Sequence, residues 1–128
     1  MPMSFFMVLA LVSTTVFAEW SEVGKQNLST LYVDPATVQR NGETVAIWFL
    51  HDLMLSEATA DGKPYRSSKQ QVEYDCLGKK ARDRFRSFHS GSMGEGDVVA
   101  SDSSLSRWEP VPTDSTEKIL LKLACNED

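Results

Sequence analysis

The stretch VQRNGETVAIWFLHDL, residues 38–53, predicts a β-hairpin and the central strand of a sheet. Asn41-Gly42 is the strongest short hairpin signal, because both central residues of a type I′ turn need a positive φ. After the turn, apolar side chains alternate onto the two sides of the strand. One side carries Val45, Ile47, Phe49 and His51, and the other carries Ala46, Trp48, Leu50 and Asp52. Apolar residues on both sides are typical of a strand at the centre of a sheet.

Segments with strand character lie on both sides of this hairpin. Alternation of residue types over 67–76 predicts a strand. Alternating arginines over 80–89 favour a strand there too, although the same residues could form a helix by propensity. The run 31–33 is expected to end at Asp34-Pro35, because proline disfavours helical geometry in the residue before it. The strands expected in addition to the hairpin cover residues 20–23, 31–33, 67–76, 80–89 and 98–100.

Residues 114–125 predict a single helix near the C-terminus. Asp114-Ser115-Thr116-Glu117 supplies a capping acceptor followed three residues later by a carboxylate. An apolar side follows, formed by Leu120, Leu121, Leu123 and Ala124. The expected fold class is therefore α+β: an antiparallel sheet of about six strands with a C-terminal helix packed on one face.

The first 18 residues predict a secretory signal peptide. They contain no charged side chain, and their apolar run at 5–12 is too short to span a membrane as a helix. The small residues of Val16-Phe17-Ala18 suit cleavage before Glu19. The usual basic segment is missing, so the start codon could lie upstream, and a buried N-terminal strand or helix is the alternative. The expected mature chain, residues 19–128, is long enough for one domain.

Cys76 and Cys125 are the two cysteines of the chain. In an oxidising compartment, an even pair in a small domain is most simply a disulfide, which here would tether the helix to the sheet. Metal ligation and thiolate catalysis are the alternatives. A metal site would need more Cys or His at close spacing, and no C-x-x-C motif is present.

Charge is distributed unevenly along the chain, whose net charge is −5. Residues 63–86 carry eight bases against three acids, whereas the segments 19–62 and 87–128 are both acidic. An acidic protein with one basic segment is not a general nucleic-acid binder.

The basic segment contains the candidate binding residues. Alternate positions on a strand face the same way, so four basic side chains are expected to form a ladder on one face, with a fifth beside it. These candidates are Lys79, Lys80, Arg82, Arg84 and Arg86. Such a ladder suits an anionic partner, while the alternative is a solvated strand face whose charges pair with nearby acids.

Catalytic chemistry has little support in this sequence. His51 and Asp52 are neighbours on a strand and would point to opposite faces, so they cannot form a base and its orienting group. Both histidines are expected at the surface, and a metal site of His51, His89 and Asp75 has no spacing in its favour. We therefore expect no enzyme activity, no catalytic residue, no metal and no cofactor.

An ordered set of motifs resembles the surface-adhesin protein E-like domain family of Gram-negative bacteria. The set spans nearly all of residues 19–128 and consists of Trp20, Leu31-Tyr32-Val33-Asp34-Pro35, Val38, Arg40, Gly42, Val45, Trp48, Tyr74-Asp75-Cys76, Gly94, Gly96, Trp108 and Ala124-Cys125. The resemblance implies a helix tied to an antiparallel sheet by a disulfide, and a role in binding matrix or serum proteins. The family's namesake has a lipid-attachment cysteine at its cleavage site, and the corresponding region here, Val16-Phe17-Ala18-Glu19, contains no cysteine.

The expected function is that of a secreted, non-enzymatic binding module for a protein or an anionic matrix component. The alternative is a soluble periplasmic accessory protein, an envelope-enzyme inhibitor or a scaffold, with no adhesin role. The expected location is the periplasm or the cell exterior, including outer-membrane association without a lipid anchor. The partner and the oligomeric state are not encoded in any motif.

Overall fold

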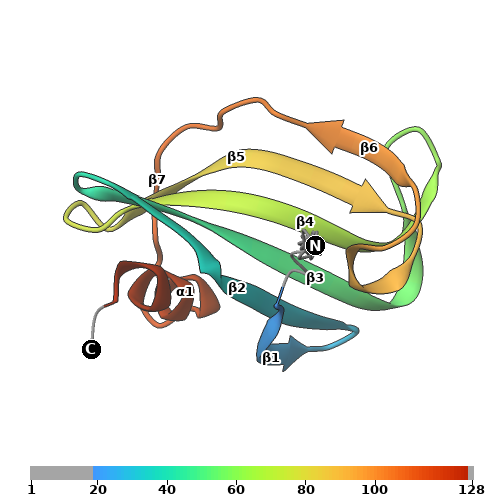
Figure 1. The fold of residues 1–128 in the computed structure, drawn as a ribbon, viewed down its shortest axis with the longest axis horizontal. Helices are drawn as coiled ribbons and strands as arrows, with labels where there is room; N and C mark the ends of the chain where they lie inside the picture. Colours follow the sequence, from blue (N-terminus) through green and yellow to red (C-terminus); the bar gives the residue numbers. More distant parts are fainter. Residues whose placement is uncertain (1–18, 127–128) are drawn as a thin grey trace, which may run out of the picture.

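The described part of the chain, residues 19–126 of a computed structural model, forms one antiparallel sheet and one α-helix (Figure 1). The expected signal peptide, residues 1–18, lies outside the described residues and stays a prediction. The elements are β1 (Ser21–Gln26), β2 (Ser29–Asn41), β3 (Thr44–Ala58), β4 (Pro64–Asp75), β5 (Lys80–His89), the 3₁₀ turn η1 (Ser92–Gly94), β6 (Val98–Asp102), β7 (Glu109–Pro110) and α1 (Thr116–Cys125).

The strands pair in the order in which they occur along the chain, from β1 to β6. The two-residue strand β7 returns to pair with the start of β5, where Ala81 lies opposite Glu109. The predicted central strand is confirmed, since β3 pairs with β2 on one side and β4 on the other. Ile47 and Leu50 point to opposite faces of β3, and both side chains are fully buried.

The β2–β3 hairpin is confirmed, but its turn differs from the type I′ turn expected at Asn41-Gly42. Asn41 pairs with Thr44, so the two loop residues are Gly42 and Glu43. Gly42 has a φ of +66°, and neither Asn41 nor Glu43 has a positive φ. Glycine at the first loop position is the pattern of a type II′ turn, which also matches the twist of antiparallel strands.

The expectation that a strand ends at Asp34-Pro35 is wrong, because β2 continues through both residues as one long strand. Its pairing with β3 is interrupted by a bulge between Asp34 and Gln39. Within the bulge the Thr37 hydroxyl accepts a hydrogen bond from the Trp48 N–H at 3.1 Å, in place of a backbone carbonyl. A bulge is one of the few places where a sheet accommodates proline, which has no N–H to donate.

The helix α1 packs on one face of the sheet, which we call the helix face. Its buried residues Leu121, Ala124 and Cys125 join a core built on the central strands. The sheet contributes Leu31, Val33, Val45, Ile47, Phe49, Val72 and Tyr74 to this core. The N-cap is Ser115, one residue later than expected, and its hydroxyl accepts a hydrogen bond from the Lys118 N–H at 3.3 Å.

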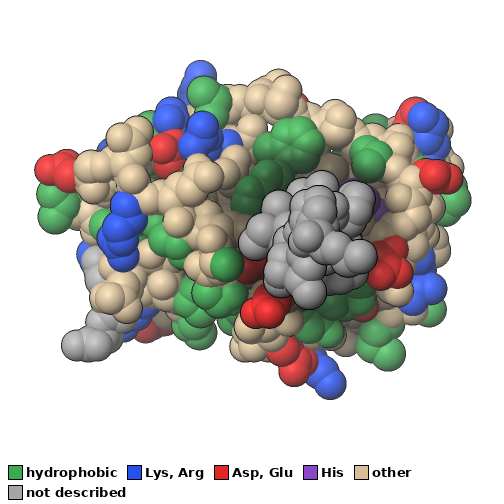
Figure 2. Space-filling view, viewed as in Figure 1, with side chains coloured by type: hydrophobic (Ala, Val, Ile, Leu, Met, Phe, Trp, Pro, Cys, Tyr) green, Lys and Arg blue, Asp and Glu red, His purple; other side chains and the backbone are tan. Residues whose placement is uncertain are grey.

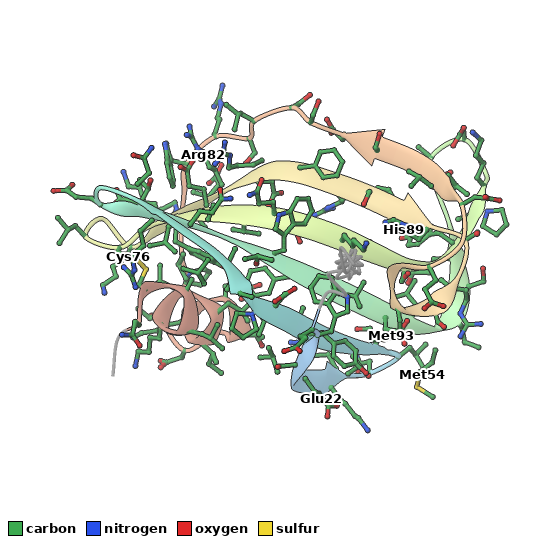
Figure 3. All side chains as sticks on the ribbon, in the orientation of Figure 1. Glu22, Met54, Cys76, Arg82, His89 and Met93 are labelled. Carbon is green, nitrogen blue, oxygen red and sulfur yellow. A yellow bond between two sulfur atoms is a disulfide. The ribbon has the colours of Figure 1, made fainter. Side chains whose placement is uncertain are left out.

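The predicted disulfide between Cys76 and Cys125 is confirmed. Cys76 lies in the turn between β4 and β5, and Cys125 is the last residue of α1. Figure 3 shows Cys76 beside the helix, at the end of the sheet where β4 and β5 meet. The bond therefore tethers the helix to the sheet across 49 residues of sequence.

Candidate functional site

The expected ladder of basic side chains on one face of β5 is wrong, because a β-bulge interrupts the strand. Gln71 on β4 pairs with Phe85, and the next residue, Val72, pairs with Asp83. Arg84 is therefore the extra residue of the bulge. Because side chains alternate along a strand, one extra residue reverses the face of every residue beyond it. Arg82 and Arg86 consequently point to opposite faces of the sheet.

Arg82 lies on the face opposite the helix and is held between two side chains. Its Nε donates a hydrogen bond of 2.6 Å to Oε1 of Glu73, which is buried on the neighbouring strand β4. Its guanidinium carbon lies 4.4 Å from the centre of the Trp108 ring, a cation–π contact. These two contacts make Arg82 part of the folded structure and leave it poorly placed for a partner.

Arg86 lies on the helix face beside two other polar side chains. Its guanidinium forms an ion pair of 3.7 Å with Asp83. It also lies close enough to His51 to disfavour protonation of that imidazole. Arg86 is therefore matched in charge by Asp83 within the protein.

The remaining candidates, Lys79, Lys80 and Arg84, are exposed. The structure adds Arg107, which sequence reasoning missed because it lies 23 residues from Arg84. Two hydrogen bonds between Ser106 and Asp83, of 3.0 and 2.7 Å, place the segment before β7 along β5. We call these four residues the cationic strip. Figure 2 shows basic side chains gathered at the upper left, over β5 and this segment.

A hollow of about 440 Å³ lies on the helix face, between the sheet, the β7 region and the start of α1. Its apolar floor includes Phe49, Val72 and Tyr74, and Leu120 of the helix borders it. His51, Gln70, Asp83 and Arg86 form a polar end, where the Gln70 amide donates a hydrogen bond to Asp83. His51 is therefore half-buried in this hollow, and the expectation of a solvated strand end is wrong.

A second hollow, an aromatic groove of about 480 Å³, lies on the opposite face of the sheet. Trp20, Trp48 and Phe85 border it, and the last two rings pack edge to face with centroids 5.5 Å apart. Trp48 is half-buried here. His89 also borders this groove and is only 5% exposed, so the expectation of a surface position for it is wrong.

The two histidines lie on opposite faces of the sheet, so the hypothesis of a metal site of His51, His89 and Asp75 is wrong. His51 pairs with Ser68, and His89 pairs with Ser67, its neighbour on β4. Asp75 lies at the far end of β4, opposite Lys80. Within residues 19–126, no group of three His, Cys, Asp or Glu side chains is arranged to hold a metal ion.

The arrangement of sheet and helix is shared with known proteins. The family model described as surface-adhesin protein E matches residues 20–126. The chain belongs to the surface-adhesin protein E family. No curated protein sequence matches it.

Two crystal structures of protein E from Haemophilus influenzae have the fold of this family member. The structure from a non-typeable strain aligns with a TM-score of 0.67 at 17% identity, covering 88% of this chain and 79% of that one. Crystal form II aligns with a TM-score of 0.64 at 15% identity, covering 75% and 80%. At such identities the likeness establishes the shared fold. Within residues 19–126 of the present chain, no helix is long and apolar enough to cross a membrane.

Both histidines of this family member have a lowered pKa, and burial is the largest cause for each. At His51 the charge of Arg86 adds to the effect and the Gln70 side chain opposes it. At His89 the charge of Lys69 adds to the effect of burial. The His89 Nε2 lies 2.8 Å from the Ser87 hydroxyl oxygen, and its Nδ1 is buried without a partner among the described residues.

These lowered values predict that the protein loses stability as the pH falls from 7.5 to 5.5. In this range the histidines of the unfolded chain, whose ordinary pKa is 6.5, become protonated, while His51 and His89 of the folded chain stay largely neutral. The unfolded state therefore binds more protons, and acid pH favours it. The free energy of unfolding, measured in urea at several pH values, should therefore decrease toward acid pH. A His51→Gln/His89→Gln variant should show a flatter dependence, and an unchanged slope in that variant would contradict the assignment.

Proposed function

We propose that this protein is a secreted, non-enzymatic binding module that docks an anionic surface of a partner on its cationic strip. The observation that carries the proposal is the exposure of Lys80, Arg84 and Arg107 on neighbouring segments of a protein whose net charge is −5. Membership of a family of surface adhesins supports a binding role. The strip replaces the ladder expected from sequence, since Arg82 pairs with Glu73 and Arg86 pairs with Asp83.

The physical basis of such docking is electrostatic complementarity. Exposed arginine and lysine side chains attract carboxylate or sulfate groups and form charge-assisted hydrogen bonds with them. These contacts steer a partner toward the strip and weaken as salt shortens the Debye length, which is about 8 Å at physiological ionic strength. Heparin is a suitable probe, because it presents many anionic groups on one flexible chain.

The test compares two triple variants that remove the same amount of positive charge. Lys80→Gln/Arg84→Gln/Arg107→Gln removes three members of the strip. Lys25→Gln/Arg40→Gln/Lys63→Gln removes three other exposed bases and is the matched control.

On a heparin column the strip variant should elute at clearly lower salt than the parent, while the control should elute close to the parent. Both variants should keep the melting temperature of the parent within a few degrees. Equal elution of the two variants would mean that net charge, rather than the strip, determines retention. Absence of retention of the parent at low salt would overturn the proposal.

The location of the protein distinguishes the adhesin role from that of a periplasmic accessory protein. Intact cells that make the protein would be treated with an external protease, with a known periplasmic protein as the control. Digestion of this chain while the control survives supports display at the surface. Protection of both supports the periplasmic alternative. N-terminal sequencing of the mature protein tests the expected cleavage before Glu19.

A further inference from the structure

The hollow on the helix face contains a buried tyrosine whose hydroxyl has no hydrogen-bond partner among residues 19–126. Tyr74 is only 3% exposed and borders the hollow. Among the described residues, the His89 Nδ1 is the one fully buried side-chain polar atom without a partner, so the Tyr74 oxygen keeps contact with the space of the hollow. A buried hydroxyl normally has a partner, and here the free position faces a cavity.

The charge around this hydroxyl is negative. Asp83, Glu109 and Glu117 border the hollow together with Arg82 and Arg86. Arg82 pairs with Glu73, and the described residues form no ion pair with Glu109 or Glu117. Arg86 is matched by Asp83. Burial raises the pKa of Tyr74 well above its ordinary value, and the carboxylates of Asp83 and Glu117 raise it further. Both carboxylates therefore act at the position of the hydroxyl.

The rest of the hollow is apolar and large enough for a small organic group. The Phe49 and Tyr74 rings pack edge to face with centroids 6.4 Å apart. Val72 and Leu120 extend this apolar lining. A volume of about 440 Å³ lies within the range of small-molecule sites in proteins.

We propose that this hollow binds an ammonium group carried on an apolar stem. The Tyr74 oxygen accepts a hydrogen bond from the ammonium, Glu117 supplies the opposite charge, and the stem packs on Phe49 and Val72. An organic anion fits less well, because Arg86 already pairs with Asp83 and the carboxylates of Asp83 and Glu117 make the electrostatic potential at Tyr74 negative. A lysine side chain of a partner and a free alkylamine share this chemistry. The site goes beyond the proposed function, since the cationic strip attracts groups of the opposite charge.

The first test uses three probes with the same apolar stem: hexylammonium, hexanol and hexanoate. Each is titrated into the intact protein, and binding is followed by NMR chemical shifts. Hexylammonium should bind saturably and at least roughly five-fold more tightly than hexanol, because a charge-assisted hydrogen bond and an ion pair add to the same apolar contact. Hexanoate should bind most weakly. Failure of hexylammonium to saturate, or tighter binding of hexanoate, would overturn the proposal.

The second test locates the ammonium in the hollow. Tyr74→Phe keeps the ring and removes the hydroxyl, and Glu117→Gln removes an exposed carboxylate in the first turn of α1. Each should weaken hexylammonium several-fold, and Glu117→Gln should leave hexanol unchanged. Glu22→Gln, which removes an exposed carboxylate on β1 outside the hollow, is the matched control and should change neither affinity. Equal effects of Glu22→Gln and Glu117→Gln would show that only net charge matters and would overturn the site.

A third comparison identifies the source of the ammonium. The peptide Gly-Gly-Lys-Gly-Gly presents a lysine side chain within a backbone. Binding of the peptide that is lost in Glu117→Gln supports a partner's lysine, whereas binding of hexylammonium alone supports a small amine. The triple variant of the cationic strip should bind hexylammonium normally, so failure of this proposal and failure of the heparin test are distinguishable.

Discussion

Replacing Cys76 and Cys125 together with serine is expected to lower the free energy of unfolding by about 4 kcal/mol. The disulfide closes a loop across 49 residues, and the chain-entropy model assigns roughly this stabilisation to a loop of that length. For a domain of this size, such a loss lowers the melting temperature by more than about 10 °C. Thermal unfolding followed by circular dichroism, with and without a reducing agent, measures the effect.

The loss of stability in the double serine variant should be concentrated at the helix, because α1 is short and its sheet contacts come mainly from Leu121, Ala124 and Cys125. Ser115→Ala is a suitable control, since it removes the helix cap and leaves the tether, at an expected cost of about 1 kcal/mol. Reduction of the parent protein should reproduce the effect of the double serine variant. If the double variant melts no lower than the Ser115→Ala variant, the tether does not determine stability.

Arg82→Met is expected to lower the free energy of unfolding by about 2–3 kcal/mol, the second largest effect. Methionine keeps an apolar stem near Trp108 but leaves the buried Glu73 carboxylate without its partner. Removing one partner of a buried ion pair costs about 3–5 kcal/mol, and the estimate is reduced because the Arg82 side chain is 28% exposed.

Arg84→Met provides the matched control for this prediction, because Arg84 is exposed at the bulge two residues away. We expect it to change the free energy of unfolding by less than about 0.5 kcal/mol. A Glu73→Gln/Arg82→Met double variant should lose less than the sum of the two single changes, since the residues interact directly. Equal losses for Arg82→Met and Arg84→Met would contradict a structural role for Arg82. Urea unfolding at neutral pH gives all four values.

Local patterns in the sequence were enough for most elements of the fold, but they did not predict β7 or the continuation of β2 through Asp34-Pro35. Alternation predicted the strands over 67–76 and 80–89, and apolar residues on both sides of residues 43–53 predicted the central position of that strand. The number and spacing of the cysteines predicted the disulfide, and the order of the motifs predicted the family. Each of these features depends on neighbours in sequence or on a single covalent bond.

The arrangement of charge on β5 could not be predicted in the same way. A bulge adds one residue to one strand only, and an exposed arginine is as compatible with a bulge as with a regular position. Only the pairing with β4 identifies Arg84 as the extra residue. That shift sends Arg86 to the helix face and to Asp83, while Arg82, which precedes the bulge, lies opposite Glu73. Two of the expected binding residues are therefore paired within the protein.

The candidate binding surfaces were likewise decided by tertiary structure. Arg107 joins the cationic strip because the segment before β7 returns to β5. The hollow beside Tyr74 lies where α1 and the segment before β7 do not fully cover the sheet. The sequence by itself determined most of the strands, the helix, the disulfide and the family, because short-range alternation and covalent chemistry specify them. The pairing register and the return of the segment before β7 decided which charges are paired within the protein and which are exposed, because both depend on contacts between residues far apart in sequence.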